Sequence, residues 1–321
     1  MSVPETNDFA PVALFCYNRP RHLQKTVEAL LLNAEASNTE LYVFCDGPPN
    51  NVQRENTDAV RRYVRALAGF KKVTVVERET NFGLSRSLVA GVTEIVNVHG
   101  NVIVLEDDLV TSPYFLRYMN DGLRIYRDRE RVASIHGYSY AHFHRVPETY
   151  FLKGADCYGW GTWKRAWKAF NNDASALYKM LIDTGLSSEF DWQYPYPYMQ
   201  SLRDQMNGKN DLWAVRWHAS AILAGMFTLY PRKSLVYHIG FDSGTNYNYD
   251  SPRFLDPLHV RLSKTPVTVE LVNKIAVVPE VAAMHRAHVR RFRWLLLYAG
   301  VRDRIYRILN RCRSRAATPV C

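Results

Sequence analysis

The sequence lacks the features of membrane-spanning, secreted and disulfide-rich proteins. No stretch reaches about 18 uninterrupted apolar residues, which a membrane-spanning helix would need. The first residues, MSVPETNDFAPV, contain no basic segment followed by an apolar one, so we predict no secretion signal. The five cysteines are widely spaced and form no CxxC pair, which argues against a zinc ribbon and favours free thiols in a reducing compartment. We therefore expect a cytoplasmic protein.

Acidic residues are fewer than basic ones. Asp+Glu number 31 against 41 Lys+Arg, which gives a formal net charge of +10. A basic protein suits an anionic partner such as a nucleotide diphosphate, a phospholipid surface or nucleic acid. No nucleic-acid recognition module is visible, so nucleic acid is not expected as a partner. The 321 residues, 47% of them hydrophobic, suffice for one large folded domain, alone or with an appendage.

The first hundred residues alternate between short apolar runs and helical patterns. The apolar runs, each typical of a buried strand, lie at 11–17, 41–45, 73–76 and 101–105. Between them, apolar residues at helical spacing predict helices over 21–33, 57–68 and 85–97. This alternation is typical of parallel strands covered by helices on both faces. We predict an α/β, Rossmann-like fold with a single open, mostly parallel sheet flanked by helices.

The chain beyond residue 110 is less regular and rich in aromatic residues. Helical patterns recur at 113–127 and 211–227, Gly and Trp gather at 150–170, and 190–198 is a Pro- and Tyr-rich loop. We expect this second half, about 111–275, to pack on the same sheet and to complete a cleft with the first half, about 9–110. One domain is therefore predicted over 9–275, followed by a basic helical tail over 276–321.

Polar residues follow each predicted strand, at the edge where open α/β sheets bind ligands. In order they are Asn18-Arg19-Pro20, Asp46-Gly47, Asn81-Phe82-Gly83-Leu84-Ser85 and Glu106-Asp107-Asp108. A cation, a carboxylate, a glycine turn before a helix and an acidic triplet together fit a nucleotide with a metal-bridged diphosphate. Taken singly, the first three segments also fit a helix start, a turn and a capped helix.

The acidic triplet Glu106-Asp107-Asp108 is the strongest single signal. Three adjacent carboxylates after a buried strand repel one another and raise each other's pKa unless a cation neutralises them. Hard divalent cations take oxygen ligands and are commonly held by one or two carboxylates plus substrate phosphates. The alternative is an acidic cluster stabilised by the dipole of the following helix. We predict Mn2+ or Mg2+ as the cofactor.

The segment VIVLEDDLVTSPYFLRYM resembles the metal-binding segment of N-acetylglucosaminyltransferase I and its bacterial relatives. That resemblance implies an inverting glycosyltransferase of the GT-A fold that uses a nucleotide sugar and Mn2+. Further segments resemble the family in order along the chain, and the match covers roughly residues 10–248. They are LFCYNRP, VFCDGP, NFGLSRSLVAGV, LKGADCYGWGTWKRAW, NDLWAVRW and LVYHIGFDSGTNY.

The resemblance assigns the nucleotide to residues after the first three strands. It implies that Asp46 contacts the base and that Asn18 and Arg19 contact the nucleotide. The residues implied to pack beside the nucleotide are Gly83, Leu84, Ser85 and Arg86. Positive charge from Arg19 and Arg86 would stabilise the phosphates.

The resemblance also divides the roles at the metal. Asp108 is implied as the direct ligand, with Glu106 and Asp107 as support towards the ribose, the sugar or metal-bound water. The late loop of the bacterial relatives often ends Gly-Thr-His, whereas this chain has Asn246 in place of the histidine. We therefore predict His238 as a substitute metal ligand.

Asp211, in the segment NDLWAVRW, is implied as the general base that takes the proton of the acceptor hydroxyl. It opens the predicted helix after a Gly-Lys-Asn loop, which would direct it into the cleft. The alternative is that Asp211 only caps that helix. Asp191 and Asp156 are rival bases. A single base opposite the leaving group implies inversion at the anomeric carbon.

Aromatic residues of the Gly- and Trp-rich segment are predicted to face the donor sugar. Rings stack on the apolar C–H faces of sugars, and glycine permits close approach of the backbone. The residues proposed for this surface are Tyr158, Trp160, Gly161 and Trp163. The alternative is that the tryptophans belong to the core.

The tail combines arginines with apolar residues and has a single acid, Asp303. Its arginines lie at 286, 290, 291, 293, 302, 304, 307, 311, 313 and 315. A basic amphipathic helix suits the inner face of an anionic membrane, where peripheral contact would bring the chain to a lipid-linked acceptor. The alternative is a helix that packs on the domain or on a second chain.

These patterns together predict inverting transfer of a hexosyl or N-acetylhexosaminyl group from a nucleotide diphosphate sugar, a UDP-sugar being favoured. The acceptor would be a hydroxyl of a glycan or of a lipid-linked molecule, as in bacterial polysaccharide biosynthesis. One alternative is a nucleotidyltransferase acting on a sugar phosphate. Another is a basic binding protein without catalysis.

Overall fold

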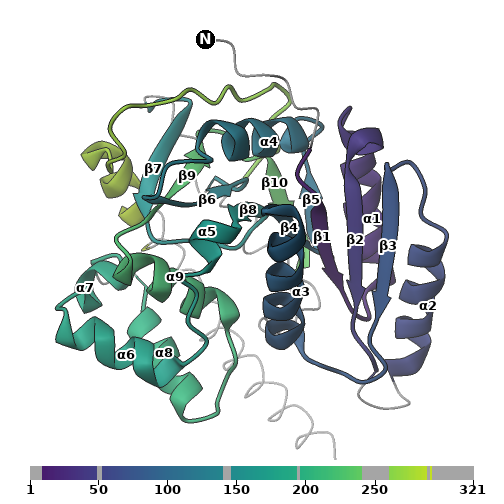
Figure 1. Cartoon of the computed structure of the whole chain (residues 1–321), viewed down its shortest axis with the longest axis horizontal. Coiled ribbons are helices and arrows are strands. Elements are labelled where there is room, and N and C mark those ends of the chain that lie inside the picture. Colours follow the sequence, from purple (N-terminus) through teal and green to yellow (C-terminus); the bar gives the residue numbers. More distant parts are fainter. Residues whose placement is uncertain are drawn as a thin grey trace, which may run out of the picture.

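A mixed sheet forms the centre of the computed structural model, which describes residues 9–48, 53–139, 146–193, 196–240, 260–287 and 290 (Figure 1). Within these residues the sheet has eight strands in the order β3-β2-β1-β4-β8-β6-β9-β7. They are β1 (Val12–Cys16), β2 (Glu40–Cys45), β3 (Lys72–Glu77), β4 (Asn101–Glu106), β6 (Val132–His136), β7 (Thr149–Lys153), β8 (Trp160–Trp163) and β9 (Phe227–Pro231). Only β7 and β8 run antiparallel to their neighbours in this sheet. The predicted open, mostly parallel sheet is confirmed.

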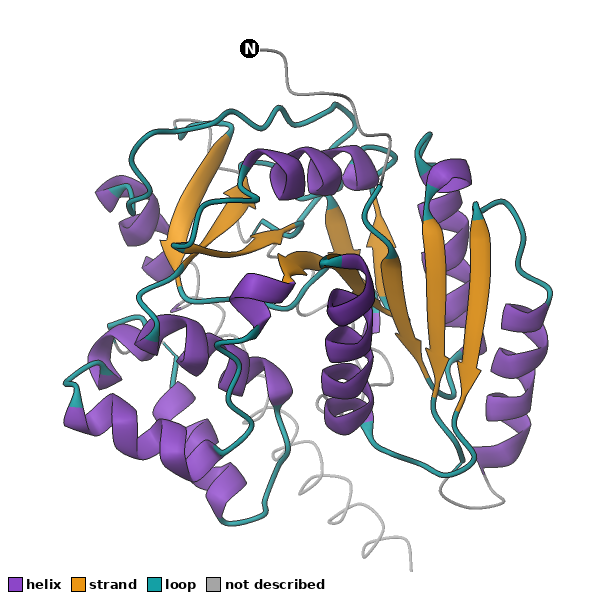
Figure 2. Cartoon of the chain, viewed as in Figure 1, coloured by secondary structure: helices purple, strands orange, loops and turns teal. Residues whose placement is uncertain are grey.

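The first half of the chain has the predicted alternation of strands and helices. The helices are α1 (Pro20–Leu31), α2 (Arg54–Arg65) and α3 (Leu84–His99). Figure 2 shows α3 on the near face of the sheet and α1 and α2 towards the other side. Gly91 lets α3 lie close to the strands, because a Cβ there would come 2.8 Å from the Phe15 ring. Gly100, in the left-handed conformation with φ 80°, ends α3.

The second half contains elements that the sequence pattern did not reveal. The predicted helix at 113–127 is α4 (Phe115–Ile125), but β6, β7, β8 and β9 had no clear periodic signal. The short helices α5 (Lys164–Trp167), α6 (Ala174–Asp183), α7 (Ser187–Phe190) and α8 (Tyr198–Met206) were also not predicted. The predicted helix at 211–227 is shorter, because α9 (Trp213–Leu223) ends before Gly225 turns the chain into β9.

A separate pair of short strands joins distant parts of the chain. β5 (Leu109–Thr111) follows the acidic triplet, and β10 (Val236–His238) pairs with it in antiparallel fashion. The register places His238 opposite Leu109. Residues separated by about 130 positions in the sequence are therefore fixed side by side at the end of β4.

The segment after residue 260 packs on the domain. Val277 forms a parallel bridge with Phe151, Val281 is fully buried, and the ring of His285 stacks 3.8 Å from that of Trp192. The predicted boundary at 275/276 therefore falls within a packed segment. The tail beyond 287, apart from residue 290, and the late-loop residues 244–246 lie outside the described residues. Within the described part of the chain, no helix is long and apolar enough to cross a membrane.

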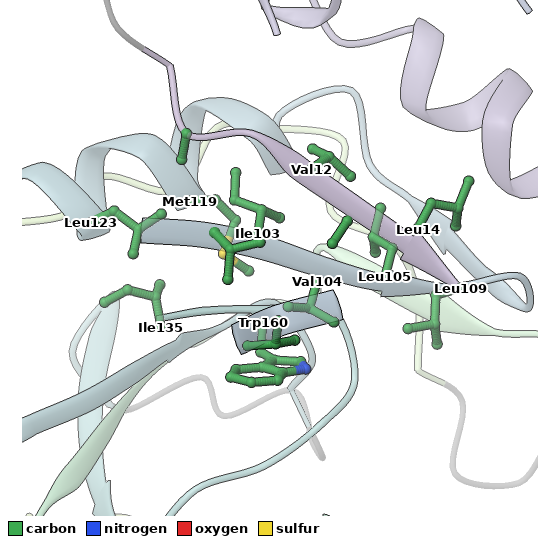
Figure 3. Packing of buried hydrophobic residues seen from close by; sticks show 14 of the residues in the cluster. Val12, Leu14, Ile103, Val104, Leu105, Leu109, Met119, Leu123, Ile135 and Trp160 are labelled. Atoms are coloured by element: carbon green, nitrogen blue, oxygen red, sulfur yellow. The ribbon is translucent and has the colours of Figure 1, made fainter. Parts of the chain in front are cut away.

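The predicted sugar-facing surface at β8 is wrong for Trp160, Gly161 and Trp163. Trp160 is fully buried beside Val104 (Figure 3), and its ring lies 5.5 Å from that of Trp213. Trp163 is also buried and donates its indole N–H to a backbone carbonyl at 3.0 Å. A Cβ at Gly161 would come 3.2 Å from the neighbouring carbonyl of β4. These residues form the core because β8 lies in the middle of the sheet.

Replacing Trp160 with Ala should lower the free energy of unfolding by about 3–5 kcal/mol, the usual cost of deleting a large buried ring. Trp160→Phe should cost less, because it keeps most of the buried volume. Urea unfolding followed by circular dichroism measures both. An unfolding free energy unchanged in Trp160→Ala would contradict the placement of this residue in the core.

Candidate functional site

The guanidinium of Arg19 bridges two carboxylates of the acidic triplet. One terminal nitrogen donates to Asp107 Oδ1, and the other, Nη1, lies 2.8 Å from Asp108 Oδ2. Arg19 follows β1 and the triplet follows β4, and these strands are parallel neighbours. Their carboxyl ends therefore meet at one edge of the sheet, as the sequence predicted. The arginine supplies the positive charge that adjacent buried carboxylates require.

The backbone around the triplet is held by bonds from two other elements. Thr26 of α1 donates its hydroxyl to the carbonyl of Asp107 at 2.9 Å. The amide of Ile239 donates to the carbonyl of Asp108 at 2.9 Å, in continuation of the β5–β10 pairing. This arrangement places His238 Nε2 3.4 Å from Asp108 Oδ2. The structure thus brings together two side chains predicted as metal ligands.

Gly240, which was not predicted from the sequence, lies directly against the Asp108 carboxylate. A Cβ at this position would come 2.1 Å from Asp108 Oδ2 and 3.0 Å from Arg19 Nη1. Only a residue without a side chain fits there unless the carboxylate moves. The signal was available, since Gly240 follows His238 by two positions within a segment already singled out.

The pKa values of Glu106 and Asp107 reflect the removal of these two carboxyl groups from water. Burial raises the pKa of Glu106 to about 8, and the charges of Asp108 and Asp107 add to the shift. Burial also raises the pKa of Asp107 to about 6, although the positive charge of Arg19 opposes the shift. A site that disfavours its own negative charge in this way is stabilised by an additional cation.

Asp108 and His238 suit a divalent cation whose remaining ligands come from the substrate. A cation roughly 2.1 Å from each of two donor atoms holds them roughly 3.0–3.4 Å apart, depending on the coordination angle. Their observed separation of 3.4 Å lies within this range. Among the described residues, no group of three or more His, Cys, Asp or Glu side chains could hold a metal. Diphosphate oxygens and water would have to complete the coordination, as is usual for Mg2+.

Asp46 is engaged by backbone amides of the loop that precedes α3. Its Oδ1 accepts from the amide of Phe82 at 2.7 Å, and its Oδ2 accepts from that of Gly83 at 2.9 Å. Asn18 donates to Gln53 Oε1 at 2.9 Å. Asp46 is 5% exposed and fixes the start of α3 relative to β2. Its contact with a base, and that of Asn18 with the nucleotide, stay predictions.

Asp211 does not cap the helix that follows it. α9 begins at Trp213 with Leu212 at its N-cap, and no side chain caps it. Instead, Asp211 Oδ1 accepts from Arg216 Nη1 at 2.7 Å, and the Asp211 side chain is 65% exposed. Arg216, which is 6% exposed, also donates to Ser85 Oγ in the first turn of α3. The predicted base is therefore tied, through Arg216, to the first turn of α3.

Arg216 was also not predicted as a site residue, although it lies in the segment NDLWAVRW together with Asp211. Among the predicted neighbours of the nucleotide, Leu84 and Arg86 are exposed, and Arg86 stacks 4.2 Å from the ring of Phe82. Tyr158, the one sugar-facing candidate outside the core, lies 5.2 Å from the ring of His238.

The rival bases have other partners. Asp191 Oδ1 accepts from the amide of Met199 at 2.8 Å, which ties it to α8. Asp156 Oδ1 accepts from the amide of Cys157 at 2.8 Å and lies 3.9 Å from His136 Nε2. Both carboxylates thus stabilise local structure. Asp191 and Asp156 are partly buried, whereas Asp211 is exposed.

Residues 12–147 match the family model described as "Glycosyl transferase family 2". The match and the mostly parallel sheet flanked by helices confirm the predicted GT-A type of fold, and they support transfer of a sugar from a nucleotide sugar. No curated protein sequence matches the chain. The more specific resemblance to N-acetylglucosaminyltransferase I is not confirmed by these comparisons.

Three solved structures are similar to the chain at low identity. TarS 1–349 of S. aureus has a TM-score of 0.38 at 11% identity, and the match covers 71% of this chain and 60% of that one. A longer TarS of S. aureus has 0.39 at 12%, covering 72% and 37%. The mannosyltransferase PcManGT of Pyrobaculum calidifontis, in complex with GDP-Man and Mn2+, has 0.29 at 13%, covering 40% and 36%. These TM-scores are too low to inform the substrate of this chain.

Gly240→Ala should displace the Asp108 carboxylate and destabilise the chain by about 1–3 kcal/mol, the usual cost of overpacking. It should also abolish any stabilisation of the chain by Mn2+ in thermal unfolding. Gly225→Ala is the control, because it strains a left-handed residue with φ 66° and has no atom within 4 Å of the added Cβ. If both variants respond equally to Mn2+, the close contact at Asp108 has no role in metal binding.

The chain without metal should lose stability as the pH rises. The folded pKa values of Glu106 and Asp107 lie above their ordinary values of 4.5 and 3.8. Such groups bind protons more tightly when folded, so their contribution is complete below the unfolded pKa and is lost as the pH rises through the folded pKa. The free energy of unfolding should therefore fall between about pH 4.5 and pH 8. Urea unfolding at several pH values should show a smaller fall in Glu106→Gln than in the unchanged chain. A fall of equal size in this variant would contradict the raised pKa of Glu106.

Proposed function

We propose that the chain transfers a sugar from a nucleotide diphosphate sugar, with a UDP-sugar favoured, to a hydroxyl of a glycan or lipid-linked acceptor. The observation that carries the proposal is the meeting of Arg19, Asp108 and His238 at the carboxyl ends of β1 and β4. One cation and two metal-ligating groups at that edge are what a departing diphosphate needs.

In this proposal Asp108 and His238 hold Mn2+ or Mg2+, with Glu106 and Asp107 as support. The bound cation would act as a Lewis acid that stabilises the negative charge of the leaving diphosphate. Arg19 is 23% exposed at its side chain, so its guanidinium is accessible to a phosphate oxygen while it holds Asp107. Gly240 lets the chain pass directly against the Asp108 carboxylate, where any side chain would collide with Oδ2.

Asp211 is the proposed general base. Its carboxylate is 65% exposed, and the charge-assisted bond from Arg216 fixes its direction. Arg216 is bonded to Ser85, which follows Gly83 at the start of α3, and Gly83 is in turn bonded to Asp46. The base is thus connected by hydrogen bonds to the predicted nucleotide side. Attack from the face opposite the diphosphate would invert the anomeric carbon, transferring a hexosyl or N-acetylhexosaminyl group.

The composition of the basic tail bears on where in the cell the chain would act. Its arginines beyond residue 287 suit an anionic membrane surface, where a lipid-linked acceptor of polysaccharide synthesis would lie. We propose peripheral contact at the inner face of the membrane and no binding of nucleic acid.

A thermal-shift screen of nucleoside diphosphates with and without Mn2+ tests the proposal. One diphosphate should stabilise the chain only when Mn2+ is present, by about 2.7 kcal/mol at a hundredfold excess over its Kd. The effect should be absent in Asp108→Asn, which removes the charge of the proposed ligand. Asp121→Asn, which removes a partly exposed charge of α4 paired with Arg124, is the matched control and should keep the response.

Stabilisation that persists in Asp108→Asn would overturn the metal assignment. No response to any nucleotide would overturn the enzymatic proposal and favour a basic binding protein. Release of pyrophosphate from a nucleoside triphosphate, in place of transfer from a nucleotide sugar, would identify a nucleotidyltransferase instead.

A further inference from the structure

A cavity of about 440 Å3 lies between α3 and the start of α9. Its walls include Ser85, Arg86 and Val89 of α3, together with Asn172, Asp211 and Arg216. The volume falls in the range of small-molecule sites, about 300–1,000 Å3. The proposed base therefore stands on the wall of a cavity large enough for a sugar or another polyol.

The cavity is lined by both apolar and polar groups, as a binding site for a polyol requires. Val89 and its neighbour Ala90 give an apolar patch on α3, suited to the C–H face of a ring. Asn172 offers an amide that can both donate and accept hydrogen bonds to hydroxyl groups. Such a site binds a ligand through a few placed polar groups and an apolar surface.

Arg216 holds Asp211 at this wall. The buried guanidinium donates to Asp211 Oδ1 and to Gln205 Oε1, each at 2.7 Å, and also to Ser85 Oγ. These partners lie on three different parts of the chain, so the position of the base is determined by α3, α8 and α9 together. The charges of Asp211 and Arg216 also cancel within the pair.

Among the described residues that line the cavity, Arg86 is the charged group that no neighbouring charge balances. It is exposed, and its guanidinium lies 4.2 Å from the centre of the Phe82 ring. The guanidinium of Arg78 also lies over the Phe82 ring, 4.8 Å from its centre, and this second contact limits how the ring can move. In the described part of the chain Arg86 forms no ion pair, so its positive charge is available to a ligand. A planar guanidinium recognises phosphate or carboxylate through two parallel hydrogen bonds.

We propose that this cavity is the acceptor site and that the acceptor is an anionic polyol or glycan, bound through a phosphate or carboxylate at Arg86. The inference rests on the proposed function. A hydroxyl of the acceptor lies at Asp211 and gives its proton to that carboxylate as its oxygen bonds to the anomeric carbon. The bond from that carbon to the diphosphate breaks, and the diphosphate leaves with the electron pair. Arg86 thus serves the acceptor and not the donor phosphates that the sequence assigned to it.

Isothermal titration of the full chain tests the class of acceptor. The chain is first saturated with Mn2+ and the nucleoside diphosphate selected by the thermal-shift screen, so that added anions cannot occupy the donor site. The probes are glucose, glucose 6-phosphate and glucuronate, which share a ring and differ in charge. We expect one charged probe to bind about tenfold more tightly than glucose. Tighter binding of glucose 6-phosphate would indicate recognition of a phosphate, and tighter binding of glucuronate would indicate recognition of a carboxylate.

Variants assign the effect to the cavity. Arg86→Ala should reduce the preference for the charged probe to less than about threefold, and Arg86→Lys should retain part of it. Arg62→Ala, which removes an exposed arginine of α2, is the matched control and should leave the preference unchanged. Ala90→Trp fills the cavity from an exposed position and should weaken all three probes while nucleotide binding persists.

Equal binding of charged and neutral probes, or a preference that survives in Arg86→Ala, overturns the anionic class. Unchanged probe binding in Ala90→Trp overturns the cavity as the site. Failure of the proposed function has a different signature, because no nucleoside diphosphate would bind in the first step.

Discussion

The bridge from Arg19 to Asp107 and Asp108 allows three consecutive acidic residues to follow a buried strand. Without that guanidinium the carboxylates would repel one another in a place with little water. The bridge also joins β1 to β4 at their carboxyl ends. The charges of the triplet are partly balanced by Arg19 because these two strands are neighbours in the sheet. Because the pKa values of Glu106 and Asp107 remain raised, the bridge does not neutralise the site completely. A further cation would therefore stabilise it.

Two long-range connections build the rest of the site around this bridge. The β5–β10 pair brings His238, and Gly240 just after it, next to Asp108, although they are remote from Asp108 in the sequence. The second connection runs through α3, whose first turn is bonded to Asp46 on one side and to Arg216 on the other. One helix start thus positions both the predicted nucleotide side and the predicted base. A change at Ser85 or Gly83 would therefore alter the positions of both Asp46 and Arg216.

The first half of the fold was predictable because buried parallel strands and amphipathic helices have distinct periods, and residues 11–105 show them clearly. The edge that collects Arg19, Asp46 and Asp108 follows from that order of strands. The second half was not predictable in this way. β8 carries WGTW, in which glycine and aromatic residues suggest a ligand surface as readily as a core strand, and only its place between β4 and β6 buries Trp160. Arg216 and Gly240 matter through contacts across the fold, which no local pattern records.

We propose that Asp108 and His238 together bind the cation of a nucleotide diphosphate. Electron paramagnetic resonance of Mn2+ bound to the chain with a nucleoside diphosphate tests it most directly, since hyperfine coupling identifies ligand nitrogen. In a chain labelled with 15N-histidine, the spectrum should show one imidazole nitrogen, and that coupling should disappear in His238→Gln. Stoichiometric binding of Mn2+ and nucleotide without histidine coupling would contradict the claim, as would undiminished Mn2+ binding in Asp108→Asn.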